Sequence, residues 1–160
     1  MITGQSSSME DYLEAIGWLS EAGNIVRVTQ LSKKLGVSKP SVSAALNKLA
    51  KAGLLKHERY GSIELTPEGR RVADDVIRRH EIMRRFLTEI LGIDRERAEE
   101  DACRMEHVLS PASLERFSEF VKFLTSCPQS EPAWHKGFSY YLEYGEHDPN
   151  MVGAGNWEER

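Results

Sequence analysis

The chain has 160 residues, of which 40% are hydrophobic and 29% charged, so it is long enough for one domain of ordinary size or two small ones with a hydrophobic core. No segment reaches the ~18 consecutive apolar residues of a membrane-spanning helix, and the N-terminal residues lack the basic and apolar regions of a secretory signal. We therefore expect a soluble cytoplasmic protein. Two cysteines, Cys103 and Cys127, are too few for a disulfide framework and are expected to be free thiols.

The first predicted helix lies within residues 6–19. Its apolar residues recur at intervals of three and four, the period of one helical face. They are Met9, Tyr12, Leu13 and Ile16. Asp11 and Glu14 lie three residues apart on a different side of the same helix, and they therefore present two carboxylates together. Judged singly, either one is more often an ordinary solvated side chain.

A strongly basic segment follows. Residues 26–85 carry 14 Lys and Arg against 6 Asp and Glu, whereas the rest of the chain carries 7 against 19, and the net charge of -4 hides this asymmetry. A basic segment within an acidic chain indicates a module that binds a polyanion such as DNA, attached to a part with another role. The alternative is a charged face that is only solvated.

Two short helices are predicted in the basic segment. Thr29 is expected to cap the first, which ends at Gly36, and Ser38 is expected to cap the second, which is closed by Gly53. Four apolar residues of the second helix follow the i, i+3, i+4, i+7 spacing and are expected to face the core: Val42, Ala45, Leu46 and Leu49. The segment after Gly53 predicts a β-hairpin. This order of elements is that of a winged helix-turn-helix.

The second of these helices has the composition of a recognition helix, because small hydroxyl residues and a lysine crowd its first turn. Such a helix enters the major groove by its N-terminal end. The tip of the hairpin is expected to lie against the sugar-phosphate backbone, although a solvent-exposed turn is the simpler alternative. The residues expected to contact double-stranded DNA are Arg27, Thr29, Ser38, Lys39, Pro40, Ser41, Ser43, Asn47, Lys48, Arg59 and Tyr60.

The second half of the chain is predicted to be helical over residues 67–91, 95–109 and 112–125. Each helix follows an N-capping residue: Thr66, Asp94 and Ser110. These helices carry more apolar residues than one thin layer hides, among them Phe86, Leu87, Ile90, Leu114, Phe117, Phe120, Val121 and Leu124. We therefore expect an isologous homodimer, which places two recognition helices about a two-fold axis for a palindromic operator.

The run DACRMEHVLS contains Cys103, Glu106 and His107. On one continuous helix, positions three and four apart share a face, so these three side chains are expected to point at a common spot. A thiolate, a carboxylate and an imidazole together suit a transition ion such as Fe²⁺, Mn²⁺, Co²⁺, Ni²⁺ or Zn²⁺ better than Mg²⁺ or Ca²⁺. The same three residue types also occur together on helices without a metal. His80, in the preceding helix, is either a surface residue or a further ligand.

Together these segments resemble the diphtheria toxin repressor and manganese transport regulator family of metal-dependent bacterial repressors. The resemblance covers roughly residues 8–127 and rests on MEDYLEAI, the winged-helix segment ending in LTPEGR, RRHE and above all ACRMEHVLS. It implies that six residues occupy the family's metal-ligand positions: Asp11, Glu14, His80, Cys103, Glu106 and His107. It also implies a repressor rather than an enzyme.

We accordingly expect a mainly α protein in three parts. Residues 1–72 form an N-terminal winged helix-turn-helix DNA-binding domain with a small β-hairpin, and residues 73–127 form an all-helical metal-binding and dimerisation domain. Residues 128–160 form a C-terminal extension whose end is mobile. Its aromatic residues are expected to pack as a stripe over the dimerisation domain: Trp134, Phe138, Tyr141 and Tyr144.

The metal-ligand positions combine two branches of the family. Asp11 and Glu14 resemble the manganese branch, whereas Cys103 resembles the iron branch, in which a methionine usually stands at the position of Asp11. Arg84 stands where the iron branch has a carboxylate of its ancillary site, and the chain ends before the SH3-like domain of that branch. The predicted function is a repressor of metal-uptake genes that senses Mn²⁺ or Fe²⁺, with Co²⁺, Ni²⁺ and Zn²⁺ possible in vitro.

Two alternatives remain open at the level of sequence. A winged-helix regulator that senses an organic ligand would keep the DNA-binding module and have no use for the metal ligands. A metal-dependent hydrolase would need an open coordination position beside a substrate pocket and a dedicated base, and no such motif is present. Stoichiometric binding of Mn²⁺ or Fe²⁺ separates the first alternative from a metal sensor, and turnover of a model ester separates the second.

Overall fold

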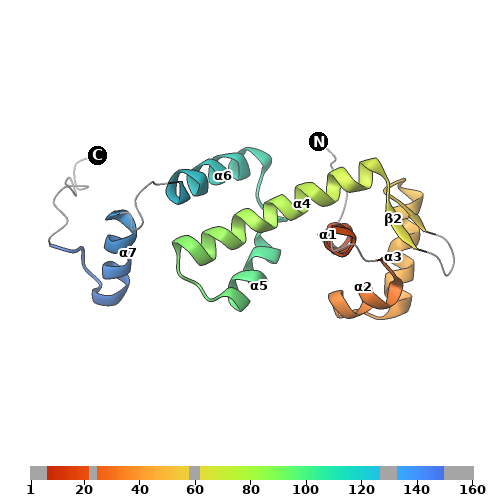
Figure 1. Ribbon diagram of the computed structural model, residues 1–160, viewed down its shortest axis with the longest axis horizontal. Helices are drawn as coiled ribbons and strands as arrows, with labels where there is room; N and C mark the ends of the chain where they lie inside the picture. The colour runs from red at the N-terminus through yellow and green to blue at the C-terminus, as the bar shows by residue number, and fades with distance from the viewer. Residues whose placement is uncertain (1–6, 22–24, 58–61, 127–132, 150–160) are drawn as a thin grey trace.

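The computed structural model describes residues 7–21, 25–57, 62–126 and 133–149 of the chain (Figure 1). The elements, in order, are α1 (Ser7–Glu21), α2 (Val28–Leu35), α3 (Lys39–Lys51), β1 (Leu55–His57), β2 (Ile63–Leu65), α4 (Pro67–Arg85), the π-helical turn η1 (Phe86–Ile90), α5 (Arg95–Met105), α6 (Pro111–Thr125) and α7 (Ala133–Tyr144). This confirms the predicted fold class. Helix α4 runs along the middle of the molecule, with α2, α3 and the hairpin at one end and α5 and α6 beside its other half.

The winged helix-turn-helix has the predicted hairpin. Strands β1 and β2 pair antiparallel, with Leu55 opposite Leu65 and His57 opposite Ile63. The inward-facing Leu55 and Ile63 are buried, which fixes the register of the pair. The predicted DNA contacts Arg59 and Tyr60 lie outside the described residues.

Most predicted helix starts are confirmed by their caps. The hydroxyl oxygens of Ser38, Thr66 and Ser110 and the carboxylate of Asp94 each accept a hydrogen bond from the backbone N–H three residues further on. The predicted cap at Thr29 is wrong. Helix α2 begins at Val28, because the side chain of Gln30 reaches back to accept from the Arg27 backbone N–H at 2.9 Å. Thr29 therefore lies inside the first turn.

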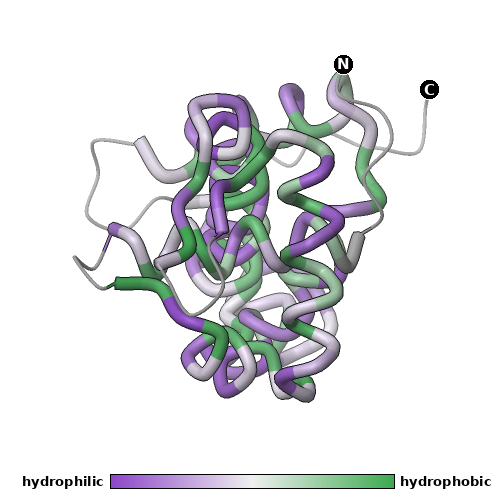
Figure 2. Tube along the Cα trace, turned by 90° about the vertical axis from the view of Figure 1, so that its right-hand side faces the viewer, coloured by the Kyte–Doolittle hydropathy of each residue, from purple (hydrophilic) through white to green (hydrophobic). Residues whose placement is uncertain are grey.

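Two hydrophobic cores share α4. Val72 and Ala73, in its first half, pack with the helices and hairpin of the DNA-binding part, whereas Met83, in its second half, packs with α5 and α6. Along these helices, hydrophobic and hydrophilic residues alternate as expected for amphipathic segments (Figure 2). His80 lies on α4 between the two cores. The predicted domain boundary at residue 72 thus falls within a helix that contributes to both.

Two predicted helices end differently in the structure. The long helix does stop at Gly92, whose φ of 67° is left-handed, but its last turn is the π-helical η1 rather than regular α-helix. The helix predicted to run to Leu109 ends at Met105, with Glu106 as its C-cap. Glu106 still has right-handed helical dihedrals and bonds the Ala102 carbonyl through its N–H, and His107 follows the end of the helix.

The predicted aromatic stripe in the C-terminal extension is wrong for its last two residues, Tyr141 and Tyr144, whereas Phe138 is half-buried. Trp134 packs against a small cluster of Ile90, Val121 and Leu124. Tyr141 and Tyr144 are 46% and 58% exposed, since α7 projects beyond the ends of α4 and α6 (Figure 1). The end of the extension, predicted to be mobile, and Cys127 lie outside the described residues. Among the helices described, none combines the length and hydrophobicity needed to cross a bilayer.

Gly69, in the first turn of α4, provides a test of how α4 is joined to the DNA-binding part. A Cβ atom on Gly69 would lie 1.7 Å from the backbone oxygen of Leu54, which also accepts a hydrogen bond from Thr66. We predict that Gly69→Ala lowers the free energy of unfolding by about 3 kcal/mol, because backbone must move to make room.

The matched control is Gly17→Ala in α1. There the added methyl group meets the flexible end of the Ile77 side chain at 2.9 Å and no backbone atom, its next neighbour being the Ala73 Cβ at 3.4 Å. Alanine also gains about 1 kcal/mol of helix propensity. Urea unfolding of both variants measures the difference. Equal stability of the Gly69→Ala protein and the unsubstituted chain would contradict this packing.

Candidate metal centre

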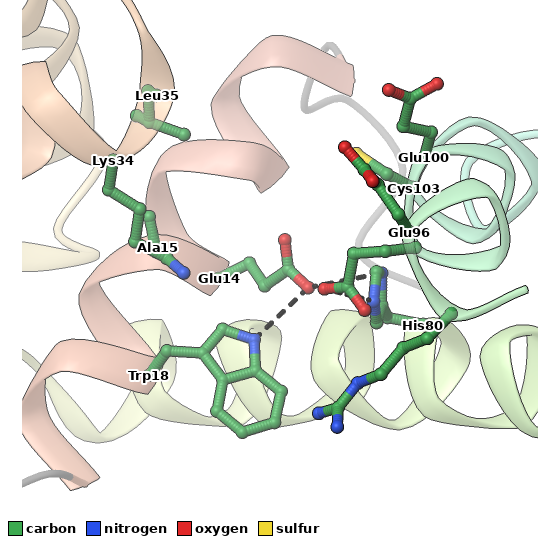
Figure 3. A pocket seen from close by; sticks show the side chains of 11 residues that line it. Glu14, Ala15, Trp18, Lys34, Leu35, His80, Glu96, Glu100 and Cys103 are labelled. Atoms are coloured by element: carbon green, nitrogen blue, oxygen red, sulfur yellow. Dashed lines mark hydrogen bonds and ion pairs between the residues drawn. The ribbon is translucent and has the colours of Figure 1, made fainter.

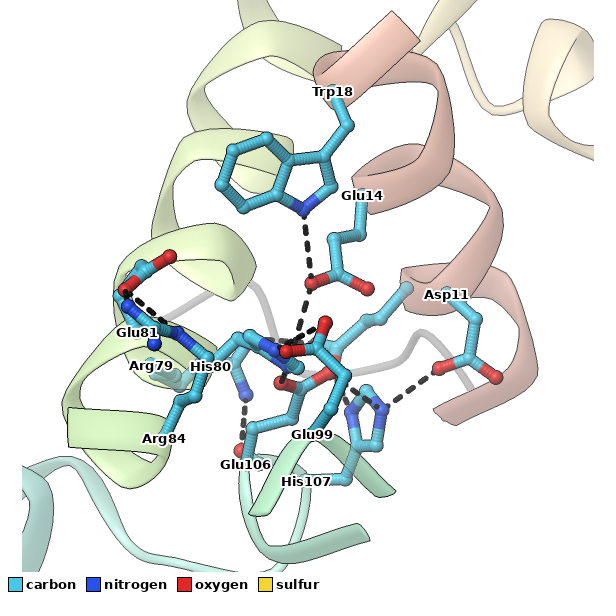
Figure 4. A network of polar contacts seen from close by, with 11 residues as sticks. Asp11, Glu14, Trp18, Arg79, His80, Glu81, Arg84, Glu99, Glu106 and His107 are labelled. Atoms are coloured by element: carbon cyan, nitrogen blue, oxygen red, sulfur yellow. Dashed lines mark hydrogen bonds and ion pairs between the residues drawn. The ribbon is translucent and has the colours of Figure 1, made fainter. Parts of the chain in front are cut away.

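Three helices bring five of the predicted ligands together (Figure 4). Helix α1 supplies Asp11 and Glu14, α4 supplies His80, and the end of α5 supplies Glu106 and His107. The apolar side of α1 is buried against the first core, as predicted, so its two carboxylates are directed toward α4 and α5. Their ligand atoms form two groups, each of three atoms within 4.8 Å of one another.

The first group consists of Asp11, Glu106 and His107. Nε2 of His107 lies 2.8 Å from Oδ1 of Asp11 and 3.2 Å from Oε1 of Glu106. An imidazole nitrogen and two carboxylate oxygens are ligand types that would suit a divalent transition ion bound there.

The second group consists of Glu14, His80 and Glu106. Nδ1 of His80 lies 2.8 Å from Oε2 of Glu106 and 3.7 Å from Oε1 of Glu14. Glu106 thus belongs to both groups and turns one oxygen toward each imidazole. Its side chain is fully buried, at 0% exposure. The arrangement offers two neighbouring cation positions joined by one carboxylate.

Unsatisfied polar atoms show that a cation fits the first group. Oδ1 of Asp11, Oε1 of Glu106 and Nε2 of His107 are buried, and none has a hydrogen-bond partner among the described residues. Both ring nitrogens of His107 lie 2.8 Å from a carboxylate oxygen, but only the contact of Nδ1 with Oε2 of Glu10 has hydrogen-bond geometry, whereas Nε2 and Oδ1 of Asp11 form no hydrogen bond. Because an ionised carboxylate only accepts, Nδ1 carries the proton. In the neutral ring, Nε2 then presents its lone pair to two carboxylate oxygens. Three electron-rich atoms facing one another are stabilised by a positive ion.

The protein environment shifts pKa values around the second group. Burial, followed by the negative charge of Glu106, raises the pKa of Glu14. Burial lowers the pKa of His80, but its hydrogen bond to Glu106 and the charges of Glu106, Glu14 and Glu99 outweigh burial, so the pKa is raised overall. Without a metal, Glu14 and His80 therefore hold protons more tightly than isolated side chains do.

Cys103 stands apart from both groups. The structure brings Glu106 and His107 into one group but does not include Cys103, whose side chain is exposed whereas that of Glu106 is buried. Cys103 is exposed and lines an open cleft of about 710 Å³ next to the second group (Figure 3). Desolvation, followed by the charge of Glu106, raises its pKa to about 11.

The cleft lies between α1, α2, α4 and α5. Its walls include Glu14 and His80 on one side, Lys34 of α2 on another, and the acidic residues Glu96, Glu99 and Glu100 of α5 (Figure 3). Negative charge around an opening of this kind attracts cations from solvent. The cleft therefore connects the second group to the outside by an acidic route.

Three residues of the centre were not anticipated from sequence. Oε1 of Glu99 lies 3.2 Å from Nε2 of His80, and Glu10 pairs with both His107 and Arg79. Glu99 lies four residues before Cys103 on α5, which is a usable helical signal. Glu10 precedes Asp11, and Arg79 lies within an arginine-rich run, so neither stood out.

Most predicted DNA contacts lie on an exposed surface of α2 and α3. The core residues of α3 are buried as predicted, which turns its polar side outward. The exposed residues are Arg27, Thr29, Ser38, Lys39, Pro40, Ser41, Asn47 and Lys48, and Ser43 is partly buried. Ser38 also caps α3 by accepting from the Ser41 backbone N–H at 3.2 Å.

Two family models match the chain. Residues 5–63 match the N-terminal DNA-binding domain of iron-dependent repressors, and residues 66–135 match their metal-binding and dimerisation domain. An uncharacterised HTH-type transcriptional regulator of Methanocaldococcus jannaschii is 36% identical over 118 residues, which are 73% of this chain and 94% of the relative. The HTH-type transcriptional regulator MntR of Bacillus pumilus is 37% identical over 116 residues, 72% of this chain and 80% of the relative.

Solved structures show the same likeness. A manganese-dependent transcriptional repressor in complex with manganese is 32% identical, with a TM-score of 0.65. The match covers 72% of this chain and 53% of that one, so this chain spans about half the length of that solved relative.

The pKa shifts predict how the stability of the metal-free protein depends on pH. Because the pKa of folded His80 is raised, its stabilising contribution is full below about 6.5 and is lost as the pH rises through the folded value. The raised pKa of Glu14 acts in the same direction, because its ionisation destabilises the folded state. We predict that the melting temperature of the metal-free protein rises on mild acidification from pH 8.

Differential scanning calorimetry of chelator-treated protein measures this dependence. The control is His80→Gln, in which the part of the pH dependence that comes from His80 is absent. A melting temperature that falls steadily from pH 8 to pH 6.5 in the unsubstituted protein would contradict the raised pKa values.

Proposed function

The chain belongs to the iron-dependent repressor family, and on that premise we propose that it is a metal-dependent DNA-binding repressor of metal-uptake genes in the cytoplasm. Mn²⁺ or Fe²⁺ is the proposed corepressor. The observation that carries this proposal is the convergence of ligand atoms from α1, α4 and α5 on the buried carboxylate of Glu106.

The proposed ligands are those predicted from sequence: Asp11, Glu14, His80, Cys103, Glu106 and His107. The bound ion supplies positive charge at the meeting point of the two groups. Asp11, Glu106 and His107 are placed to hold one cation, and Glu14, His80 and Glu106 a second one. Cys103 lines the cleft beside Glu14 and His80 and is the proposed further ligand of the second position; to bind, it must lose a proton, because its pKa is raised to about 11.

Ligand types restrict the choice of metal without fixing it. The two groups offer only oxygen and nitrogen, which suit Mn²⁺ and Fe²⁺, and a thiolate from Cys103 would favour Fe²⁺. Co²⁺, Ni²⁺ and Zn²⁺ are expected to bind in vitro as well, because they stand higher in the Irving–Williams order.

The link from the metal centre to DNA runs through α1. Its ligands Asp11 and Glu14 lie on one face, while Leu13 and Ile16 pack in the same core as Leu46 of the recognition helix α3. Fixing α1 against α4 and α5 therefore fixes the position of α3. A protein whose recognition helices are already placed loses less conformational freedom on binding an operator, so its affinity rises.

The operator is bound in this proposal by a homodimer. Helix α6 buries Leu114, Val121 and Leu124 but exposes Phe120 and Phe123, at 50% and 73%, on its other side. Exposed aromatic side chains of this size are typical of an interface core. The DNA contacts are those predicted on α2, α3 and the wing, and two copies of α3 about a two-fold axis fit a palindromic site.

Substitution of Phe123 tests the dimer. We predict that Phe123→Glu converts the protein to a monomer at micromolar concentration, since it places a charge in an apolar interface, while Lys122→Glu, at the exposed neighbouring position, leaves the dimer intact. Sedimentation velocity measures both. A dimeric Phe123→Glu protein would exclude this face of α6 as the interface.

Operator affinity against free metal tests the function as a whole. We predict that Mn²⁺ or Fe²⁺, titrated anaerobically, raises the affinity for operator DNA, and that His107→Ala removes most of this increase. Cys103→Ala is expected to have a larger effect with Fe²⁺ than with Mn²⁺. Gel-shift titration and fluorescence anisotropy provide the readout, with Glu21→Gln on α1 as the control.

Metal-stimulated binding that is unchanged in both variants would contradict the proposal. Operator binding that needs no metal in the unsubstituted protein would contradict it as well, and it would favour a regulator that senses another ligand.

A further inference from the structure

We propose that Glu10 and Arg79 form a positioning clamp that orients His107 for metal binding, without either residue being a ligand. The inference rests on the proposed function, because it concerns the same centre. It adds two residues that belong to neither group of ligands. Both act through the ring of His107.

The two ring nitrogens of His107 face neighbouring residues of α1, and only Nδ1 forms a hydrogen bond. Nδ1 lies 2.8 Å from Oε2 of Glu10, and Nε2 lies 2.8 Å from Oδ1 of Asp11. The side chains of consecutive helical residues point about 100° apart, so the carboxylates of Glu10 and Asp11 lie on two sides of the ring. Oε2 of Glu10 accepts a hydrogen bond from the Nδ1–H group, and Nε2 is thereby directed at Asp11 and Glu106 (Figure 4).

Arg79 binds the second carboxylate oxygen of Glu10. Its Nη2 lies 3.2 Å from Oε1 of Glu10, and its Nη1 donates to the backbone oxygen of Glu106 at 2.9 Å. That oxygen belongs to the peptide that joins Glu106 to His107. One guanidinium group, which Asp75 also contacts at 3.3 Å, thus fixes both the carboxylate that orients the ring and the backbone that carries it.

Burial separates this clamp from an ordinary surface ion pair. The side chains of Arg79 and Glu10 are only 14% and 18% exposed, and the contact joins α4 to α1 across a long stretch of sequence. Glu99, which faces the outer nitrogen of His80 at 3.2 Å, is by contrast 58% exposed. A contact shielded from solvent holds its geometry better than one open to water.

The chemical need for a clamp lies in the histidine tautomers. A neutral imidazole carries its proton on either nitrogen, and only the form protonated at Nδ1 offers Nε2 to a cation. Carboxylates that hold the outer nitrogen of a metal-binding histidine fix that form, and their loss typically costs about 10- to 100-fold in metal affinity.

The test is a double-mutant cycle on the full-length chain, with Mn²⁺ alone as the probe. We expect Glu10→Ala to weaken Mn²⁺ binding by about 10- to 100-fold. Glu10→Gln, whose side-chain oxygen still accepts from Nδ1, should weaken it less. In a His107→Ala background, Glu10→Ala should have no further effect, because its partner is gone. Glu21→Ala, on the exposed end of α1, is the matched control, and free Mn²⁺ is followed by its electron paramagnetic resonance signal.

A second readout does not involve metal. Long-range ¹H–¹⁵N correlation spectra of the metal-free protein, recorded in mildly alkaline buffer, report which imidazole nitrogen carries the proton. We expect the Nδ1–H form of His107 in the unsubstituted protein and in Glu10→Gln, and a mixture of forms in Glu10→Ala. Arg79→Lys, which keeps the charge but cannot span both acceptors, should also give a mixture.

Three results would overturn the clamp: unchanged Mn²⁺ affinity in Glu10→Ala, an equal loss in the His107→Ala background, or an Nε2–H ring in the unsubstituted protein. If the unsubstituted chain binds no Mn²⁺ or Fe²⁺, the proposed function fails instead. The tautomer spectra then decide the clamp by themselves.

Discussion

The structure depends on one buried carboxylate. Glu106 is fully enclosed, and its two oxygens face His80 on one side and His107 on the other. A negative charge removed from water must be compensated, by a proton, a hydrogen-bonded cation or a metal ion. Around Glu106, further carboxylates of Asp11 and Glu14 add to the same charge. The packing of α1 against α4 and α5 is therefore tied to whatever positive charge occupies the space between them.

This dependence arises because the centre lies between two hydrophobic cores rather than inside one. Each core is held together by apolar side chains on its own side of α4, and Val72 and Met83 belong to different cores. The polar contacts among α1, α4 and the end of α5 lie between these two cores. Arg79 supplies a permanent link there, through Glu10 and the backbone of Glu106, and a cation would supply a conditional one. A sensor of metal concentration requires such a contact between its two parts, one that forms only when the metal is bound.

Much of the fold could be predicted from local signals. Ser38, Thr66 and Asp94 cap helices as expected, because a hydroxyl or carboxylate before an amphipathic run satisfies free backbone N–H groups. Five of the six predicted ligands meet in space, since family motifs mark them even on distant helices. Sequence spacing failed where a helix ended early. The helix that carries Cys103 ends at Met105 instead of Leu109, and Gln30, not Thr29, forms the contact at the start of α2. Arg79 could not be singled out, because its importance comes from contacts 69 residues apart with Glu10.

The most direct measurement is hydrogen–deuterium exchange of α1 and α3 with and without Mn²⁺, in the unsubstituted protein and in Glu106→Gln. If the shared carboxylate joins the two parts through a cation, Mn²⁺ slows exchange in both helices of the unsubstituted protein and has little effect in Glu106→Gln. Exchange in α1 and α3 that is the same with bound Mn²⁺ as without it would contradict the account.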